Sequence, residues 1–556
     1  MTITIFLIAA TMIHADTETV NGITWTYTVT GDTVSIGGGS SSSTAVPTST
    51  SGAITIPSTI DGKLVTAIGS YAFSGCGALT NVTVPNSVTN IEEYAFCHCS
   101  GLMNIAIPDS VTTIGEYAFA YCDGITAVVI PNSVKVVCIG AFAYCKKLKK
   151  IYIPPSVTEL GDYCFAHCEE LEEIQLPSSI TSLGRSCFEY CNSLKSIIIP
   201  NNVGIIGEDI FQSCIGLEHV TISNKVIQIP SHAFNGCRAL RDINLPDNLI
   251  HIDCMAFGKC SSLRKITLPS QLESIGWGAF SESGLEELYL PSSVKSVGYS
   301  AFKECNSLKN VDILLNTSLK KLDKFTFEGC SSLEKIIIPE AISDIGEWTF
   351  AKCTSLKKIL LPSTIKRIGN GLFSNCDNLQ TINDLDNIEE IGQEAFFCCR
   401  NLKHFKIPYS VEKIGHAVFG GIHIQRLEIL SNRFEKDEIA LYSKNKKELI
   451  EVLMIQSEWA IPDSVETIRE WAFYCCPIKK LLIPKSVKKI EKNAFVSSKI
   501  DLIIIESLIE LERDSFCAEI GSIVVPTQLL EYYRLSVRDQ YGFRNIEKKF
   551  IGKSEK

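Results

Sequence analysis

The chain has 556 residues, of which 45% are hydrophobic and 21% are charged, so it can form a substantial core and is not disordered as a whole. The formal net charge of −10 gives no general attraction to phosphate or anionic lipid, which excludes nucleic acid and membrane surfaces as default partners. A chain of this length contains either three or four ordinary domains or one long array of repeats.

The first residues, 1–15, predict a secretory signal peptide. An apolar run extends from Ile3 to Ile13, and Ala15 stands before the polar Asp16, which places cleavage near Ala15. The segment has no basic start and Ile13 is large for its position, so a buried N-terminal strand is the alternative. No later run reaches the ~20 apolar residues that a membrane-spanning helix needs. We therefore expect a secreted or cell-surface protein without a transmembrane helix, and a cytoplasmic protein as the alternative.

Residues 16–53 predict a small β-structured cap and a Ser/Thr-rich segment. The run ITWTYTVT alternates in the manner of a strand, and the turn dipeptides Asn21-Gly22 and Gly31-Asp32 border it. The segment from Gly37 to Gly52 is either an exposed, O-glycosylated linker or a degenerate first turn of the structure that follows. The second alternative is favoured, because a repeat pattern begins directly afterwards.

From residue 54 the chain repeats itself with a period of 23 residues. The consensus is IPxSVxxIGxxAFxxCxxLxxIxIP, and a segment at 431–457 interrupts it. Its phenylalanine recurs in nineteen copies, at Phe73, Phe96, Phe119, Phe142, Phe165, Phe188, Phe211, Phe234, Phe257, Phe280, Phe302, Phe327, Phe350, Phe373, Phe396, Phe419, Phe473, Phe495 and Phe516. A period of this length is typical of a solenoid, in which stacked units share one core.

Each copy predicts one strand, one shorter extended piece and one tight arc. The alternation in IxI has the period of two of a β-strand, and the proline that follows ends the strand because it has no N–H to donate. The segment SVxxIG is the second extended piece, and AFxxC is the arc that returns the chain to the next strand. Stacking these units at roughly 4.8 Å would place equivalent residues above one another. The sequence therefore predicts a β-rich repeat solenoid with a stacked parallel sheet.

The end of the chain predicts a C-terminal cap at 527–556. The sequence VPTQLLEYYRLSVRDQYGF begins with the last strand of a repeat and then changes to helical spacing. We therefore expect a short helix to cover the open end of the stack. The last residues, NIEKKFIGKSEK, form a polar tail.

The repeat IPxSVxxIGxxAFxxCxxLxxI resembles the BspA-type, or Treponema pallidum-type, leucine-rich repeat, over about Ile54 to Pro526. Val20 to Gly38 resembles the β-rich start of such proteins, and residues 434–452 resemble the hairpin that the family inserts between repeats. The resemblance implies repeats at 54–430 and 458–526 around a β-hairpin-like insert at 431–457. It further implies a surface antigen that adheres to host cells, matrix proteins or other microbes.

The cysteines are predicted to pack and not to react. Most of the 23 lie three residues after the repeated phenylalanine, whereas a catalytic cysteine would occur once. Cys164 and Cys187 lie outside this column, one period apart, and form the pair best suited to a disulfide in an exported protein. The CHC sequence at 97–99 lacks the ligand spacing of zinc sites.

Motifs of enzymes and cofactor sites are missing from the sequence. It contains no HExxH, no GxSxG elbow, no P-loop and no GxGxxG that follows a strand. Neighbouring carboxylates such as Glu172 and Glu173 are better explained as a solvated charged face than as an acid and base pair. We therefore predict a protein that is not an enzyme and needs no cofactor and no metal.

The residue between the two buried positions of IxI must point outwards. Several of these outward residues are large and apolar, namely Val129, Tyr152, Ile198, Tyr289, Ile337 and Leu360. They predict a face that binds a protein or glycoprotein, although strands favour such residues even without a partner. The first hypothesis is a secreted or surface-associated, monomeric interaction protein. The second is an intracellular structural or assembly scaffold.

Two sequence motifs predict N-glycosylation if the chain is exported. Asn81 begins the tripeptide NVT, and Asn316 begins NTS.

Overall fold

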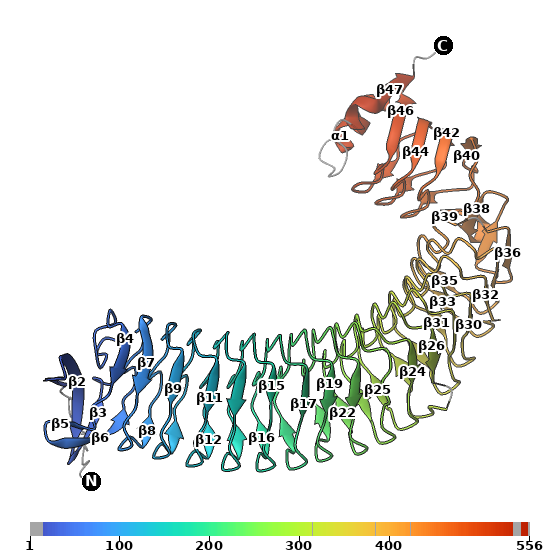
Figure 1. Cartoon of the computed structure of the whole chain (residues 1–556). Helices are drawn as coiled ribbons and strands as arrows, with labels where there is room; N and C mark the ends of the chain where they lie inside the picture. The colour runs from blue at the N-terminus through green and yellow to red at the C-terminus, as the bar shows by residue number, and fades with distance from the viewer. Residues whose placement is uncertain (1–14, 314, 384, 423, 538–545, 554–556) are drawn as a thin grey trace, which may run out of the picture. The chain divides into compact units, whose positions relative to one another are not determined.

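The computed structural model describes residues 15–313, 315–383, 385–422, 424–537 and 546–553. The chain divides into two compact units. The first comprises Met1–Leu272 and Glu282–Gly284, and the second comprises Glu273–Ser281 and Leu285–Lys556. Each unit is a stack of coils in which the strands of successive repeats lie side by side (Figure 1). The predicted signal peptide at 1–15 lies outside the described residues, except for its last position.

Regular coils contribute two short strands, and most of these strands pair in parallel with their equivalents in the next coil. In β11 and β13, Ala127 pairs with Lys150 and Val129 with Tyr152. In the second ladder, Asn90 pairs with Thr113. The alternation in IxI buries its first isoleucine and directs the following residue to solvent, as in β13, where Ile151 is buried. The predicted parallel solenoid is confirmed.

The first unit contains two rows of strands. The row formed by the IxI segments, called the strand face below, contains β4 (Gly52–Thr55), β7 (Leu79–Thr83), β9 (Asn104–Ala106), β11 (Ala127–Val129), β13 (Lys150–Tyr152), β15 (Glu173–Ile174), β17 (Ser196–Ile198), β19 (His219–Thr221) and β21 (Asp242–Asn244). The second row contains β6 (Lys63–Ile68), β8 (Asn90–Ile91), β10 (Thr113–Ile114), β12 (Val136–Val137), β14 (Glu159–Leu160), β16 (Ser182–Leu183), β18 (Ile205–Ile206), β20 (Gln228–Ile229) and β22 (His251–Ile252).

The second unit repeats this arrangement. Its strand face contains β24 (Glu287–Tyr289), β26 (Asn310–Asp312), β28 (Lys335–Ile337), β30 (Lys358–Leu360), β32 (Thr381–Ile382), β34 (His404–Ile407), β36 (Arg426–Ile429), β40 (Glu458–Ala460), β42 (Pro477–Ile483), β44 (Lys499–Ile505), β46 (Glu519–Pro526) and β47 (Phe550–Lys553). Its second row contains β23 (Ser274–Ile275), β25 (Ser296–Val297), β27 (Lys321–Leu322), β29 (Asp344–Ile345), β31 (Arg367–Ile368), β33 (Glu390–Ile391), β35 (Lys413–Ile414), β39 (Glu448–Val452), β41 (Thr467–Ile468), β43 (Lys489–Ile490) and β45 (Glu510–Leu511).

The repeated phenylalanines form the centre of the core. Phe96, Phe119 and Phe142 have no exposed surface. Their rings lie nearly parallel, with centroids 5.1 Å apart between Phe96 and Phe119 and 5.3 Å apart between Phe119 and Phe142. Offset parallel stacking at this distance is favourable in addition to the burial of the rings. The column therefore links each coil to the next along the core.

The repeated cysteines join adjacent coils through hydrogen bonds. The Cys122 thiol donates to the carbonyl oxygen of Phe96 in the preceding coil, at 3.1 Å, and Cys145 donates to that of Phe119 at the same distance. Burial raises the pKa of the Cys122 thiol well above its ordinary value. A thiol that stays protonated, donates a hydrogen bond and is buried has a packing role, as predicted.

The arc between the two strands contains two residues in the left-handed region of φ. In one repeat these are Tyr117, with φ 52°, and Tyr121, with φ 61°. The Phe119 N–H donates to the Ala141 carbonyl at 2.8 Å, and the Tyr121 N–H donates to that of Ala143 at 2.9 Å. Every second residue of the arc is thus bonded to the next coil. The sequence pattern did not predict these conformations, because residues other than glycine rarely adopt them.

The N-terminal end is covered by an antiparallel sheet, as predicted. It consists of β1 (Asp16–Val20), β2 (Ile23–Thr30) and β3 (Thr33–Ile36), and β5 (Thr59–Ile60) lies beside β6. Trp25 is buried and meets Phe73 edge to face at 6.3 Å between ring centroids. Within the Ser/Thr-rich segment, Ala45 is buried and its N–H donates to the Ala72 carbonyl. This segment packs onto the stack in the manner of a degenerate turn.

The interrupting segment contains an antiparallel hairpin. β37 (Phe434–Lys436) pairs with β38 (Ala440–Ser443), and η1 (Lys444–Lys446) leads to β39, which pairs antiparallel with β38. β39 also pairs in parallel with β41, so the segment supplies a strand to the second row.

One buried carboxyl group fixes this hairpin segment to the preceding repeat. Glu451 is 2% exposed, and its oxygens accept hydrogen bonds from the Phe419 N–H at 3.0 and 3.1 Å. Burial raises the pKa of Glu451 to about 8. Elsewhere in the array the N–H of the repeated phenylalanine donates to a backbone carbonyl of the next coil. Here the carboxyl group of Glu451 takes the place of that carbonyl as the acceptor.

The C-terminal end is capped by η2 (Thr527–Leu529), α1 (Leu530–Ser536), η3 (Ile546–Lys549) and β47. The short helix was predicted, and it buries Tyr533. The Tyr533 hydroxyl accepts a hydrogen bond from the Ile509 N–H at 2.8 Å and donates one to the Ser507 carbonyl at 2.6 Å. β47 pairs in parallel with β46, a final strand that the sequence pattern did not predict.

Candidate binding face

The strand face exposes most of the apolar residues predicted to bind a partner. In the first unit, Val129, Tyr152 and Ile198 are 65%, 52% and 69% exposed. In the second unit, Tyr289 and Ile337 are exposed and Leu360 is half-buried. Their positions follow from the pleat, because the residues on either side of them point into the core. Their role in binding stays a prediction.

On the first unit these residues line a continuous trough. One hollow contains Val129, Tyr152 and Pro155, and the next contains Ile198. The two hollows share the side chains of Glu173, Gln175 and Leu176. Prolines that end the strands, such as Pro177 and Pro200, also line these hollows. The trough is therefore a direct product of the repeated IxIP sequence.

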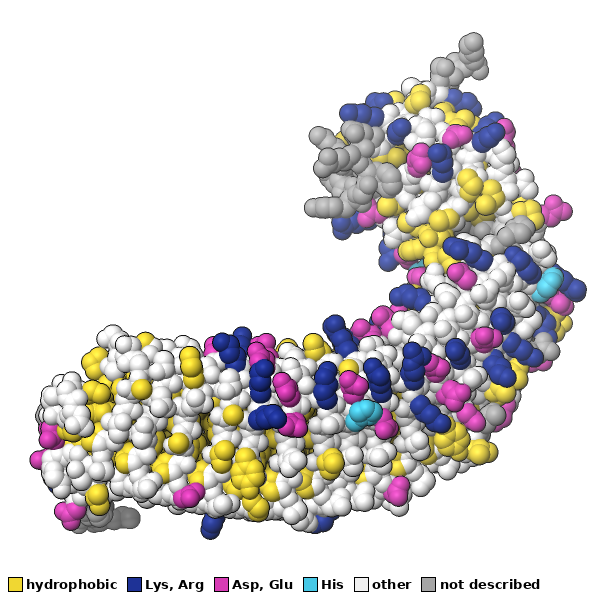
Figure 2. Space-filling view, in the orientation of Figure 1, with side chains coloured by type: hydrophobic (Ala, Val, Ile, Leu, Met, Phe, Trp, Pro, Cys, Tyr) yellow, Lys and Arg dark blue, Asp and Glu magenta, His cyan; other side chains and the backbone are white. Residues whose placement is uncertain are grey.

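Charged residues beside this trough are paired with one another. Lys150 Nζ lies 3.0 Å from Glu173 Oε1, and Lys149 Nζ lies 3.6 Å from Glu170 Oε2. Basic and acidic side chains are intermixed over β13 to β19 (Figure 2). These pairs are exposed and contribute little to stability, but they leave the edge of the trough nearly neutral. Such an edge matches a protein partner better than a polyanion.

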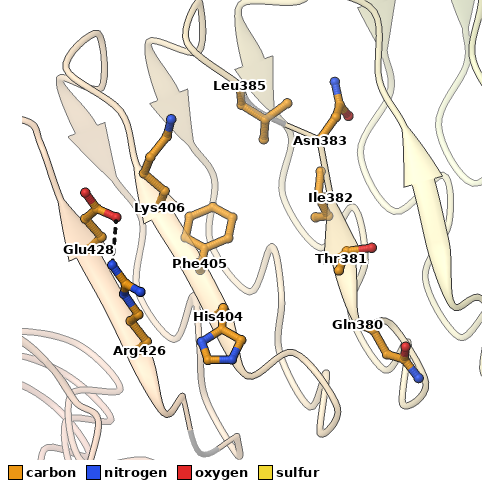
Figure 3. Close-up of a pocket in the computed structure, with 10 residues that line it drawn as sticks. All are labelled: Gln380, Thr381, Ile382, Asn383, Leu385, His404, Phe405, Lys406, Arg426 and Glu428. Carbon is orange, nitrogen blue, oxygen red and sulfur yellow. Dashed lines mark ion pairs between the residues drawn. The ribbon is translucent and has the colours of Figure 1, made fainter.

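The second unit has a hollow between β32 and β34 (Figure 3). Phe405, Ile382 and Leu385 form its apolar part. His404, Lys406 and Arg426 contribute basic groups, and Arg426 Nη2 lies 3.9 Å from Glu428 Oε2. The hollow is open and carries both signs of charge, so its chemistry resembles that of the trough.

An interruption of the sheet creates this second hollow. The sheet that begins at β24 ends at β32, and β34 pairs with β36 in a separate sheet. The Asn383 side chain accepts a hydrogen bond from the Leu361 N–H at 2.8 Å and donates one to the Leu361 carbonyl at 2.9 Å. The amide of Asn383 thus replaces backbone pairing at the end of β32.

The two predicted glycosylation sites differ in exposure. Asn81 is exposed on β7, and its glycosylation stays a prediction. Asn316 is fully buried, and its amide donates to the carbonyls of Pro291 and Val294 at 2.9 and 3.0 Å. Glycosylation of Asn316 also stays a prediction, and it would require the amide nitrogen to be free of these two hydrogen bonds.

The predicted disulfide pair is close enough to interact. Cys164 and Cys187 are both buried, free thiols, and a hydrogen bond between them contributes to the raised pKa of Cys164 after the larger effect of burial. A disulfide between them stays a prediction for the exported protein.

In the part of the chain that the structure describes, no three or more His, Cys, Asp or Glu side chains come together in a group that could hold a metal ion. No helix there has the length and apolarity to cross a bilayer.

A model of the BspA type leucine-rich repeat region matches residues 66–195, 181–309, 320–446 and 455–539. These matches cover most of the sequence. The chain belongs to the BspA-type leucine-rich repeat family. The predicted resemblance is therefore confirmed, and with it the repeat fold. Arrays of this kind generally present extended surfaces for protein–protein interaction.

Solved structures of other leucine-rich repeat proteins are similar to this chain. A leucine-rich repeat protein from Bacteroides ovatus is 28% identical, with 71% of this chain and 95% of that chain covered and a TM-score of 0.49. A leucine-rich cell surface protein from Faecalibacterium prausnitzii is 27% identical, with 66% and 94% covered and a TM-score of 0.43. The T. pallidum leucine-rich repeat protein is 26% identical, with 44% and 90% covered and a TM-score of 0.26. No curated protein matches the chain.

A second surface feature was missed at the level of sequence. In this BspA-type array, the second left-handed position of the arc is aromatic in five successive repeats, at His98, Tyr121, Tyr144, His167 and Tyr190. The signal was present as an aromatic residue every 23 positions. It was hidden because both histidine and tyrosine occur there and the consensus treats the position as variable.

Proposed function

We propose that this protein is secreted or held at the cell surface, where it binds a protein or glycoprotein through its strand face. In this role it serves adhesion to host cells, extracellular matrix or other microbes. The observation that carries the proposal is the trough of the first unit, where Val129 and Tyr152 are exposed on neighbouring strands and Ile198 is exposed two coils beyond Tyr152. Exposed apolar side chains with neutralised charges at their edge are typical of protein-binding surfaces.

The arrangement supports binding and not catalysis. A partner that lies across successive strands contacts one outward residue per coil, so many weak contacts add up along the array. The aromatic Tyr152 and Tyr289 supply the largest contact area and a hydroxyl group each, as interface residues commonly do. Leucine-rich repeats are generally scaffolds for interaction, and we propose that this chain acts in that way.

The test combines Tyr152→Ser with Tyr289→Ser and measures binding to a panel of purified matrix and cell-surface proteins. We expect the double variant to keep its circular dichroism spectrum and to bind its partner at least tenfold more weakly. The matched control is Ile205→Ser, which removes a side chain that is 70% exposed on β18, outside the strand face. Equal binding by the double variant and the wild type would refute the role of these tyrosines.

Export is tested separately by N-terminal sequencing of protein from its native cell. Cleavage near Ala15 supports secretion. Recovery of a chain that still begins at Met1 would favour the alternative, an intracellular scaffold.

A further inference from the structure

A ladder of stacked rings lies on the arc surface of the first unit. It consists of His98, Tyr121, Tyr144, His167 and Tyr190, whose successive centroids are 4.4, 4.4, 4.3 and 4.4 Å apart. The planes of neighbouring rings differ by 8° to 13°. Each inner ring is covered on both faces by its neighbours. Only the ring edges of the inner members reach solvent.

The backbone at this ladder is strained. All five residues have φ between 57° and 61°, a region that favours glycine. Equivalent positions in other repeats adopt the same left-handed φ with residues of every size, from Gly236 to Lys259 and Glu304. The conformation therefore belongs to the repeat, and the ladder differs from the other repeats only in carrying a ring at this position.

The ladder ends at Tyr190 beside a shelf of small residues. Tyr190 is 37% exposed, and one face of its ring stacks on His167. The next two positions of the column are Ser213 and Gly236, which carry no ring. A Cβ atom at Gly236 would lie 3.3 Å from Ser213 Oγ, so these two positions pack closely against each other. Neither carries a side chain as large as the Tyr190 ring. The second face of Tyr190 is thus the wall at one end of the shelf.

Polar side chains border this shelf in the neighbouring column. Gln212 Nε2 donates to Glu189 Oε1 at 2.8 Å. In the following coil, Asn235 Oδ1 is buried and has no hydrogen-bond partner among the described groups. An acceptor in this state is unusual in a native protein and indicates a place where a donor is missing. Gln212 and Ser213 thus lie in the coil after Tyr190, and Asn235 lies one coil further on, with its Oδ1 beside Gly258.

The charges near the shelf favour a neutral ligand. Arg185 Nε donates to Asp209 Oδ2 at 3.2 Å, and His232 Nδ1 lies 3.5 Å from Asp209 Oδ1. Asp209 thereby pairs with the basic groups of the adjacent column, and Glu189 contributes a negative charge. A ligand with a carboxylate or sulfate group would be repelled by Glu189.

We propose that the shelf beside Tyr190 binds a neutral sugar residue. One apolar C–H face of the sugar ring stacks on the free face of Tyr190, as a further rung of the ladder. The sugar hydroxyls exchange hydrogen bonds with Gln212 and Ser213, and one hydroxyl donates to Asn235 once the amide turns towards the shelf. This site lies on the arc surface, and it is independent of the protein-binding role proposed for the strand face.

The test uses saturation-transfer NMR on the full chain, with the methyl glycosides of glucose, galactose, mannose and N-acetylglucosamine as probes. We expect at least one glycoside to receive saturation, strongest on the protons of one ring face. In Tyr190→Gly, which suits the left-handed backbone, its affinity should fall about tenfold. Gln212→Leu keeps the ring and should weaken binding as well, because it removes a hydrogen-bonding partner of the hydroxyls.

His98→Gly is the matched control. It makes the same change at the other end of the ladder and uncovers a face of Tyr121, but the neighbouring column there holds Cys97 in place of the polar groups. Glycoside binding should therefore be unchanged in this variant. The proposal is overturned if none of the four glycosides binds the wild type, or if Tyr190→Gly and His98→Gly bind equally well.

Discussion

Phe119 and Cys122 illustrate what one residue contributes to a repeat array. The Phe119 ring stacks between the rings of Phe96 and Phe142. The backbone carbonyl of Phe119 accepts a hydrogen bond from the Cys145 thiol of the next coil. Cys122 makes the same bond to the preceding coil. Each side chain therefore takes part in contacts on both sides. A change at one position acts on the junctions between three coils.

Phe119→Ala is expected to lower the free energy of unfolding by ~3–5 kcal/mol, the usual cost of truncating a buried aromatic residue. Cys122→Ser should cost less, because a hydroxyl can still donate to the Phe96 carbonyl. Both values can be measured by urea unfolding followed by circular dichroism. Val129→Ala, an exposed position, serves as the control and should change stability by no more than about 0.5 kcal/mol. A cost for Cys122→Ser as large as that for Phe119→Ala would contradict the packing role described here.

At the scale of elements, the hairpin segment depends on a single buried acid. The backbone N–H of Phe419 would be buried without a partner if Glu451 did not accept its hydrogen bond. That bond favours the ionised carboxylate, whereas burial favours the protonated form, and burial has the larger effect on the pKa. Attachment of the hairpin segment is therefore linked to pH.

The stability of this segment should fall as pH rises from about 4.5 to about 8, the ordinary and folded pKa values of Glu451. In this window the folded state binds a proton that the unfolded state has released, so deprotonation favours unfolding. Glu451→Gln should remove this dependence and be more stable than the wild type above pH 8, by on the order of 5 kcal/mol at most. Thermal unfolding at a series of pH values measures the effect.

Glu438→Gln, an exposed change in the same hairpin, should keep the wild-type pH dependence. Glu451→Ala should be less stable than Glu451→Gln at every pH, because alanine leaves the Phe419 N–H without an acceptor. Parallel pH profiles for the wild type and Glu451→Gln would contradict the assignment.

The elements that sequence reasoning predicted are those fixed by repetition. The period places Phe119 and Cys122 in columns, and the alternation of IxI separates buried Ile151 from exposed Tyr152. The features that it missed depend on single residues or on the backbone. Glu451 occurs once, and its burial follows from a tertiary contact. The ring at Tyr190 is placed by a left-handed φ, which a consensus of side chains does not reveal.

At the scale of the whole molecule, the distribution of thiols is very uneven. Cys475 is exposed, and Cys138, Cys254, Cys398 and Cys517 are partly exposed. The other eighteen cysteines are buried. Burial also raises the pKa of the thiols in the column, which lowers the fraction of reactive thiolate. The fold therefore protects a cysteine-rich chain from oxidation and exchange.

A maleimide should label Cys475 first in the native protein, and Cys475→Ser should remove this fast reaction. Mass spectrometry of labelled peptides measures the order of reaction. Unfolding without a reductant should then make all 23 cysteines reactive, or two fewer if Cys164 and Cys187 form the predicted disulfide. Rapid labelling of Cys122 in the native state would contradict the buried column.

The regular hydrogen bonds from alternate residues of each arc to the next coil have a consequence for how the gene can change in length. Deleting or duplicating a whole copy of 23 residues rejoins arcs that still match, so recombination between copies can vary the number of coils without loss of the fold. Inserting or deleting only one or two residues shifts the arc relative to the next coil, so these hydrogen bonds no longer align. At the irregular spacing between Phe302 and Phe327 the buried amide of Asn316 ties the longer loop back to Pro291 and Val294. Asn316 thus shows how the array has absorbed an insertion smaller than one copy.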